Sequence, residues 1–226
     1  MDYKPLIDDL MVMHLNDDYD DTIVNFALNN CSRDIYNQAQ WLKDEGNVHF
    51  KNGEVVSAGA KYDRGLKFLC FGLPSNADDS VMLWNLAIVL ELNLAACALK
   101  VHDYNQTKKL CSLVLKFDGS NVKSFYRRAS AEIRLYQLEE AYEDLGKAAK
   151  IEPNNKDILR ELERLTGLRG QASKLNGKRG AENSDLTHCT HTKKGKASEP
   201  LVSLVCNPSS HSEDQSGVTS CLPTTN

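Results

Sequence analysis

The sequence predicts an all-α fold of paired helices, and two observations support this prediction. Amphipathic helical segments alternate with short polar or glycine-containing breaks between about residue 37 and residue 169. The sequence that starts at Ala95 also resembles the sequence that starts at Ala129, 34 residues later. A period of this length is typical of stacked helix–turn–helix repeats, because each hairpin needs a neighbour to bury its apolar face.

The breaks divide this part of the chain into three predicted hairpins and one further helix. Asn52–Gly53 separates the helices of the first hairpin, and a loop of breaker residues ends at Asp79 or Ser80, either of which could cap the next helix. The hairpins cover about residues 39–72, 81–118 and 121–153. A capping helix at 156–168 would cover the last hairpin, and the whole would form a right-handed superhelix.

Two flanking segments lack this periodicity. Residues 1–36 form an acidic extension with one expected helix near Thr22–Leu28. Its acidic cluster, Asp17–Asp21, is interpreted as solvated surface, with an intramolecular decoy for a basic groove as the alternative. Residues 170–226 are rich in Ser, Thr, Gly, Asn and Lys, which predicts a disordered tail. We therefore expect one folded domain at 37–169.

Composition limits the classes of protein to consider. A net charge of -4 argues against nucleic-acid binding through bulk charge. The seven cysteines contain no Cys-x-x-Cys pair and are odd in number, which disfavours a disulfide framework and a structural zinc site. The first ten residues lack a signal-peptide pattern, and no run of 18 apolar residues occurs. We expect a cytoplasmic protein, with the nucleus as a second allowed location.

Five polar residues recur on the first helices of the three hairpins: Lys43 and Asn47, then Asn93, then Lys123 and Arg127. Residues four apart share one face of a helix, and the first helices of stacked hairpins line a concave groove. Lys and Arg donate charge-assisted hydrogen bonds to carboxylates, whereas Asn can donate to a carboxylate and accept from a peptide N–H. The five residues together predict a peptide-binding groove, although each one alone could be ordinary solvated helix surface.

The segments around these residues resemble a known family. Lys43–Asn47 resembles the Lys-x-x-Gly-Asn opening of carboxylate-clamp tetratricopeptide repeat (TPR) domains. Leu92–Cys97 resembles their Asn-containing second repeat, and Lys123–Arg128 resembles their Lys-x-x-Tyr-Arg third repeat. Within this family the likeness is greatest to the C-terminal TPR domain of large, plant-type FK506-binding peptidyl-prolyl isomerases, over about residues 37–168.

The resemblance implies a clamp that grips two carboxylates of a C-terminal Glu-Glu-Val-Asp tail, as found on heat-shock protein 90 and heat-shock protein 70. Carried over by position, Lys43, Asn47 and Asn93 would hold the main-chain carboxylate, and Lys123 and Arg127 would reach the Asp side chain. The implied function is that of a noncatalytic co-chaperone or adaptor. The sequence does not indicate which chaperone is preferred or whether the chain dimerises.

Two other functions stay open from the sequence. One is a scaffold whose groove binds an internal peptide of an unrelated partner. The other is a relative of the FK506-binding isomerases, but only about 36 residues precede the helices and an isomerase domain is larger, so we expect no catalysis. His188, Cys189 and His191 fall short of a closed metal site. We expect no catalytic residues, cofactor, metal, membrane or specific nucleic-acid partner.

Overall fold

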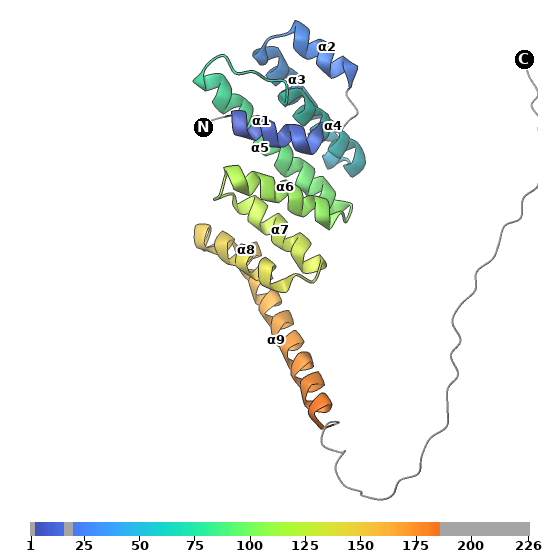
Figure 1. The fold of residues 1–226 in the computed structure, drawn as a ribbon, viewed down its shortest axis with the longest axis vertical. Helices are drawn as coiled ribbons and strands as arrows, with labels where there is room; N and C mark the ends of the chain where they lie inside the picture. The colour runs from blue at the N-terminus through green and yellow to red at the C-terminus, as the bar shows by residue number, and fades with distance from the viewer. Residues whose placement is uncertain (1–2, 16–19, 186–226) are drawn as a thin grey trace, which may run out of the picture. The chain divides into compact units, whose positions relative to one another are not determined.

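The computed structural model describes residues 3–15 and 20–185, with side chains described up to residue 170. Those residues form nine α-helices and no β-strand (Figure 1). In chain order the helices are α1 (Lys4–His14), α2 (Asp21–Asn29), α3 (Ser32–Lys51), α4 (Val55–Leu69), α5 (Ala77–Lys100), α6 (Tyr104–Phe117), α7 (Val122–Arg134), α8 (Leu138–Ile151) and α9 (Lys156–Asp185). The predicted all-α fold is confirmed for this part of the chain.

Three helical hairpins form the body of the domain: α3 with α4, α5 with α6, and α7 with α8. Each second helix also packs against the first helix of the next hairpin, so the hairpins stack in chain order (Figure 1). The first helices contact one another as well, α3 with α5 and α5 with α7. This is the stacked arrangement that the 34-residue spacing predicts, and it gives the domain one surface made of first helices.

The first hairpin begins earlier than the periodicity indicates. α3 starts at Ser32 rather than near residue 39, and the backbone N–H of Cys31 donates to Asp34 Oδ2 at 3.2 Å in a capping arrangement. At the other end, Gly53 adopts a φ of 84°, a left-handed conformation that favours glycine. The chain therefore turns at the predicted break and α4 begins two residues later.

α5 also begins earlier than expected. Its N-cap is Asn76 instead of Asp79 or Ser80, and the Asn76 side chain accepts the backbone N–H of Asp79 at 2.8 Å, so the helix starts at Ala77 instead of near residue 81. By length and composition α5 could cross a membrane, but most of its apolar stretch is buried inside the domain. That burial is what the central core helix of a packed repeat array requires.

Three groups of buried side chains hold the described residues together. The largest includes residues of the first two hairpins, among them Leu42, Leu66, Leu83 and Leu90, each at most 2% exposed. A second group joins α7, α8 and the start of α9, and a small third group lies between α5 and α6. Because every hairpin shares buried surface with its neighbours, the hairpins stabilise one another.

α9 caps the last hairpin and then continues beyond its predicted end. Ile158 and Leu165 are buried against Phe125 and Leu145, which is the predicted covering role. The helix runs to Asp185 instead of ending near residue 168, so residues 170–185 are helical and not part of a disordered tail. The low hydrophobicity of this segment predicted that it would not fold. A segment that continues an existing helix needs no new nucleus, however, because extending a helix is easier than starting one. Residues 186–226 of the predicted tail lie outside the described residues.

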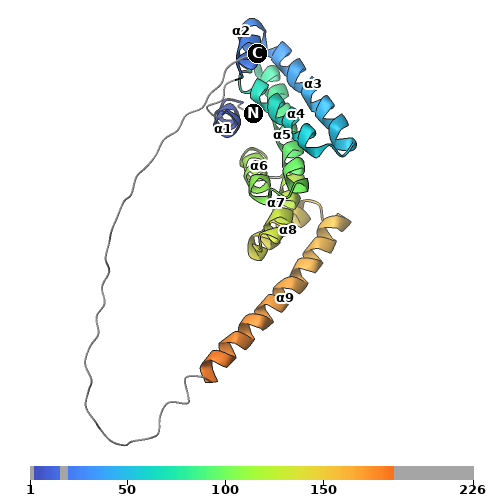
Figure 2. The same ribbon diagram turned by 90° about the vertical axis from the view of Figure 1, so that its right-hand side faces the viewer.

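The N-terminal segment packs against the repeats, whereas residues 1–36 were expected to form an acidic extension outside the folded domain at 37–169. Tyr3, Leu6 and Leu10 of this segment are at most 1% exposed, and the Tyr3 hydroxyl donates to the Leu69 carbonyl of α4 at 2.9 Å. α1 lies on the side of α4 that faces away from α3 (Figure 2). The three apolar positions recur at helical spacing and form a narrow buried stripe, a signal that the surrounding charges obscured.

α2 is the helix expected near Thr22–Leu28. Asp20 caps it by accepting the backbone N–H of Thr22 at 3.0 Å. The same carboxylate lies 3.1 Å from Arg64 of α4, the second helix of the first hairpin. This member of the acidic cluster therefore does not pair with the surface formed by the first helices of the hairpins. Residues 17–19 of the cluster lie outside the described residues, and the decoy alternative is untested there.

Candidate functional site

The five predicted binding residues lie on α3, α5 and α7, and two contacts join these helices. The amide nitrogen of Asn93 donates to Asn47 Oδ1 at 3.4 Å, which links α5 to α3. The guanidinium of Arg127 donates to the carbonyl oxygen of Leu92 at 2.6 Å, which links α7 to α5. Because Leu92 precedes Asn93, the two contacts place Asn47, Asn93 and Arg127 along one continuous strip of the three first helices.

Asn47 is held in place by a tyrosine from the second helix of its own hairpin. The Tyr62 hydroxyl donates to Asn47 Oδ1 at 2.9 Å. This approach requires Gly46, since a Cβ atom there would lie 2.5 Å from Tyr62 Cε1. Burial raises the pKa of Tyr62 to about 12, so the hydroxyl stays a donor at neutral pH. With its oxygen occupied by Tyr62 and Asn93, Asn47 offers its amide N–H groups to a ligand.

Arg127 is half-buried and positioned by a backbone contact. Burial lowers the pKa of its guanidinium, but an arginine starts from so high a value that it keeps its charge at neutral pH. Only one of its five N–H donors is needed for the bond to Leu92. The remaining donors form a fixed fork, a geometry suited to a carboxylate or to peptide carbonyl groups.

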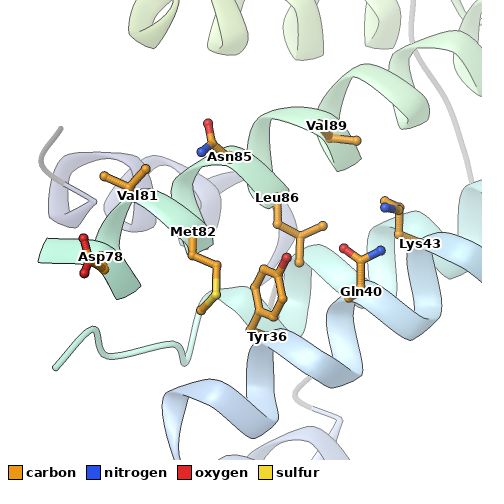
Figure 3. A pocket seen from close by; sticks show the side chains of 9 residues that line it. All are labelled: Tyr36, Gln40, Lys43, Asp78, Val81, Met82, Asn85, Leu86 and Val89. Atoms are coloured by element: carbon orange, nitrogen blue, oxygen red, sulfur yellow. The ribbon is translucent and has the colours of Figure 1, made fainter. Parts of the chain in front are cut away.

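Lys43 lies at one end of the strip. Its ammonium is 3.4 Å from the neighbouring Asp44 carboxylate, and its side chain is only 19% exposed. It also lines a hollow of about 480 Å³ between α3 and α5, where Tyr36 and Leu86 lie between Lys43 and Asp78 (Figure 3). The floor of this hollow is therefore largely apolar.

Lys123 lies at the opposite end of the strip, one turn before Arg127 on α7. Both residues line a second hollow of about 390 Å³, together with apolar side chains that include Leu99 and Ile158. Lys123 is exposed and makes no ion pair with a described carboxylate. The structure thus joins Asn47, Asn93 and Arg127 through direct contacts, whereas Lys43 and Lys123 lie at the ends of the strip without a hydrogen bond to these three residues.

Sequence reasoning missed two members of this arrangement. Tyr62 was not among the five predicted binding residues, although Gly46 is a signal that a bulky group approaches α3 closely. The carbonyl of Leu92 carries no side-chain signal, so its bond to Arg127 follows only from the stacking of the hairpins. In the described ranges no group of three His, Cys, Asp or Glu residues could hold a metal ion, and His188, Cys189 and His191 lie outside those ranges.

Comparison with solved structures reveals the family. The C-terminal TPR-containing domain of an FK506-binding protein from Plasmodium falciparum superposes with a TM-score of 0.61 and 33% identity, covering 66% of this chain and 99% of that domain. The chain belongs to the TPR family. This finding confirms the resemblance to the TPR domains of FK506-binding proteins, although no protein-family model matches the chain.

Other TPR proteins share the fold. UNC-45 from C. elegans, solved with a Hsp90 peptide and also with a Hsp70 peptide, has a TM-score of 0.54 and 28% identity, covering 66% of this TPR chain and 15% of UNC-45. The first TPR of Spaghetti (RPAP3), bound to the HSP90 peptide SRMEEVD, has a TM-score of 0.50 and 27% identity, covering 59% of this chain and 94% of that one.

Curated relatives are longer proteins. Outer envelope protein 61 of Arabidopsis thaliana is 31% identical over 167 residues, which are 73% of this chain and 28% of that protein. The unc-45 homolog B of Danio rerio is 33% identical over 124 residues, or 12% of its length. The chain therefore spans less than a third of the length of these relatives.

Proposed function

We propose that the strip on α3, α5 and α7 is a two-carboxylate clamp for the C-terminal Glu-Glu-Val-Asp tail of heat-shock protein 90 or heat-shock protein 70. The protein would then act as a noncatalytic adaptor in the cytosol. One observation supports this most directly: the Asn93–Asn47 and Arg127–Leu92 contacts align three clamp residues between two lysines. A single line of donors across three repeats is suited to an extended peptide end.

The five residues divide into two groups in this proposal, one for each carboxylate. Lys43, Asn47 and Asn93 donate to the terminal main-chain carboxylate, and Lys123 and Arg127 donate to the side-chain carboxylate of the last Asp. Hydrogen bonds to charged groups contribute about 1.5 to 3 kcal/mol each. Association and ordering cost roughly 4 to 15 kcal/mol, so micromolar affinity is expected. The contacts that already hold Asn47 and Arg127 reduce the ordering cost.

The structural neighbours support the same class of ligand. UNC-45 was solved with Hsp90 and Hsp70 peptides, and the RPAP3 TPR with a peptide that ends in Glu-Glu-Val-Asp. The RPAP3 peptide ends in the kind of acidic residue that the strip of donors would bind. The similarity favours a chaperone tail over the open alternative, an internal segment of an unrelated partner.

Titration with the peptide Ser-Arg-Met-Glu-Glu-Val-Asp tests the proposal, with the wild type compared to Lys43→Ala and Arg127→Ala. Lys150→Ala is a matched control, because Lys150 is an exposed lysine on α8, outside the strip. We expect Lys43→Ala and Arg127→Ala to weaken binding tenfold or more and Lys150→Ala to leave it unchanged. No binding by the wild type, or equal binding by all four proteins, would contradict the clamp.

A C-terminally amidated copy of the same peptide separates the clamp from the alternative. Amidation removes the main-chain carboxylate and keeps every side chain, so a clamp should lose most of its affinity. A groove for internal peptide segments would bind both forms equally. A prolyl isomerisation assay on the whole chain tests the third function, and a rate above background would contradict a noncatalytic role.

A further inference from the structure

The outer side of the first hairpin lies at one end of the stack and is only partly covered (Figure 1). In the two later hairpins this side of the first helix is buried, because α5 packs on α4 and α7 packs on α6. In the described part of the chain, α3 has only the short helix α2 in this place. α2 covers the C-terminal part of α4, where the Phe26 ring lies edge-on to the Phe68 ring with 5.3 Å between their centroids. The remainder of this side is open.

Five residues form the open part, which we call the end face: Trp41, Glu45 and Val48 of α3, with Ser57 and Lys61 of α4. Their spacings of three and four residues place them on one side of each helix. The Trp41 side chain is 51% exposed and that of Val48 is 57% exposed. Tryptophan is highly buried on average in folded proteins and is enriched at the centres of protein interfaces. The end face therefore has the composition of a docking surface.

The end face points away from the clamp. Lys43 follows Trp41 by two residues on α3, and two residues correspond to about 200° around a helix with 3.6 residues per turn. A partner on the end face thus leaves the strip on α3, α5 and α7 open.

The charges of the end face are opposite and balanced. The ammonium of Lys61 lies 3.1 Å from the Glu45 carboxylate and 5.4 Å from the centroid of the Trp41 ring. A face with one acid and one base offers no advantage to a strongly acidic or strongly basic partner. A two-fold axis through this face, in contrast, places each Lys61 between its own Glu45 and the Glu45 of a second copy. The end face is therefore complementary to itself.

A hollow of about 580 Å³ lies beside the Trp41 ring, with Leu42 and Ala60 also in its lining. The other charged side chains that line it are paired within the chain, Arg64 with Asp20 and Lys67 with Asp63, each at 3.1 Å. An exposed aromatic ring next to a hollow with balanced charge gives two copies a knob and a hole each.

From these observations we infer that the end face is the interface of a symmetric dimer of this chain. The Trp41 ring of each copy packs into the hollow of the other, and Lys61 pairs with the partner subunit's Glu45. A contact that uses the same face of both copies is closed, so association stops at two copies. The dimer carries two outward-facing strips, and its formation does not depend on what those strips bind.

Sedimentation equilibrium of the full chain over a series of concentrations tests the dimer. One hairpin face is at the small end of interface sizes, so we expect dissociation in the micromolar range. Trp41→Ala should weaken dimerisation at least about tenfold, because a buried tryptophan is a typical interface hot spot. The control Tyr142→Ala removes an exposed aromatic side chain from α8, at the other end of the stack, and should leave dimerisation unchanged.

Tryptophan fluorescence gives a second readout. The chain has two tryptophans, and Trp84 is only 7% exposed, so a change of emission with concentration reports on Trp41. We expect the emission to move to shorter wavelength as the dimer forms. A wild type that stays monomeric throughout the series, or a folded Trp41→Ala that associates as strongly as the wild type, would overturn the inference. Circular dichroism shows whether each variant is folded.

Exchange of the two charges tests the symmetry of the interface. Lys61→Glu and Glu45→Lys each place like charges across the two-fold axis, so each variant alone should dimerise more weakly than the wild type. In an equal mixture of the two variants, both contacts across the axis join opposite charges again, and dimerisation should recover. The pair within each chain stays broken, so recovery requires contact between copies.

Bulk attraction does not explain such recovery, because each substitution changes the net charge of -4 by two units and both variants stay net negative. Undiminished dimerisation of the separate variants, or no recovery on mixing, would contradict the pairing of Lys61 with the partner subunit's Glu45.

Discussion

The imidazole of His14, at the end of α1, lies 2.6 Å from the Glu91 carboxylate at the centre of α5. Its other ring nitrogen lies 2.9 Å from the Asp63 carboxylate of α4. His14 is 5% exposed and Glu91 is fully buried. One side chain thus joins three helices, and α1 is anchored here and also at Tyr3.

Stability should depend on the protonation of His14. Burial alone would lower the pKa of this imidazole, but its hydrogen bonds and charge interactions with Asp63 and Glu91 outweigh burial and raise the pKa to about 9. A raised pKa in the folded state stabilises the protein fully below the unfolded value of 6.5, and this stabilisation is lost as pH rises through about 9. A shift of this size corresponds to about 3 kcal/mol.

Urea denaturation of the wild type and His14→Gln between pH 6 and pH 10 measures this dependence. We expect the free energy of unfolding of the wild type to fall more steeply across that range than that of the variant, in which only the buried thiols, whose pKa values burial raises, still destabilise the fold as pH rises. Parallel curves for the two proteins would show that His14 does not titrate as expected.

Removal of His14 alone should destabilise the fold more than replacement of both His14 and Glu91. His14→Ala leaves the Glu91 carboxylate buried without its partner, at a cost of about 3 to 5 kcal/mol. The double variant His14→Leu/Glu91→Met fills the space with apolar atoms and should be more stable than His14→Ala. Urea midpoints at pH 7 check this order, and a double variant less stable than His14→Ala would contradict it.

Gly46 and Gly146 should respond in opposite ways to alanine. At Gly46 a Cβ atom would lie 2.5 Å from the Tyr62 ring, so Gly46→Ala forces α3 and α4 apart, at about 1 to 3 kcal/mol. At Gly146, in the middle of α8, nothing lies within 4 Å of such an atom, and Gly146→Ala should stabilise by up to about 1 kcal/mol. Thermal melting checks both, and equal shifts would argue against a close approach at Gly46.

Tyr62→Phe should weaken peptide binding with little effect on the core. The change removes only the hydroxyl that positions Asn47, because the ring packed on Gly46 is kept. One hydrogen bond of about 1 kcal/mol corresponds to about a fivefold loss of affinity. Titration with the Glu-Glu-Val-Asp peptide measures the loss, and Tyr142→Phe on α8 is the control. Unchanged affinity would mean that Asn47 is positioned without Tyr62.

Local signals were sufficient for several helices. The predicted ends of the second and third hairpins, near residues 118 and 153, agree with the ends of α6 and α8, because the breaks after Phe117 and Ile151 act within a few residues. The start of α5 was misplaced because several residues of one loop could serve as its cap. The expected end of α9 was wrong because low hydrophobicity does not by itself stop a helix.

The sequence by itself determined the repeat of helix hairpins and the face on which Lys43, Asn47, Asn93, Lys123 and Arg127 lie, because period, breaks and helix faces are local properties. Tertiary structure alone decided which of these residues meet. It also decided that α1 belongs to the core through His14 and that Lys61 reaches Trp41. These partners are far apart in the chain, and their distances depend on how the hairpins stack, which no local pattern encodes.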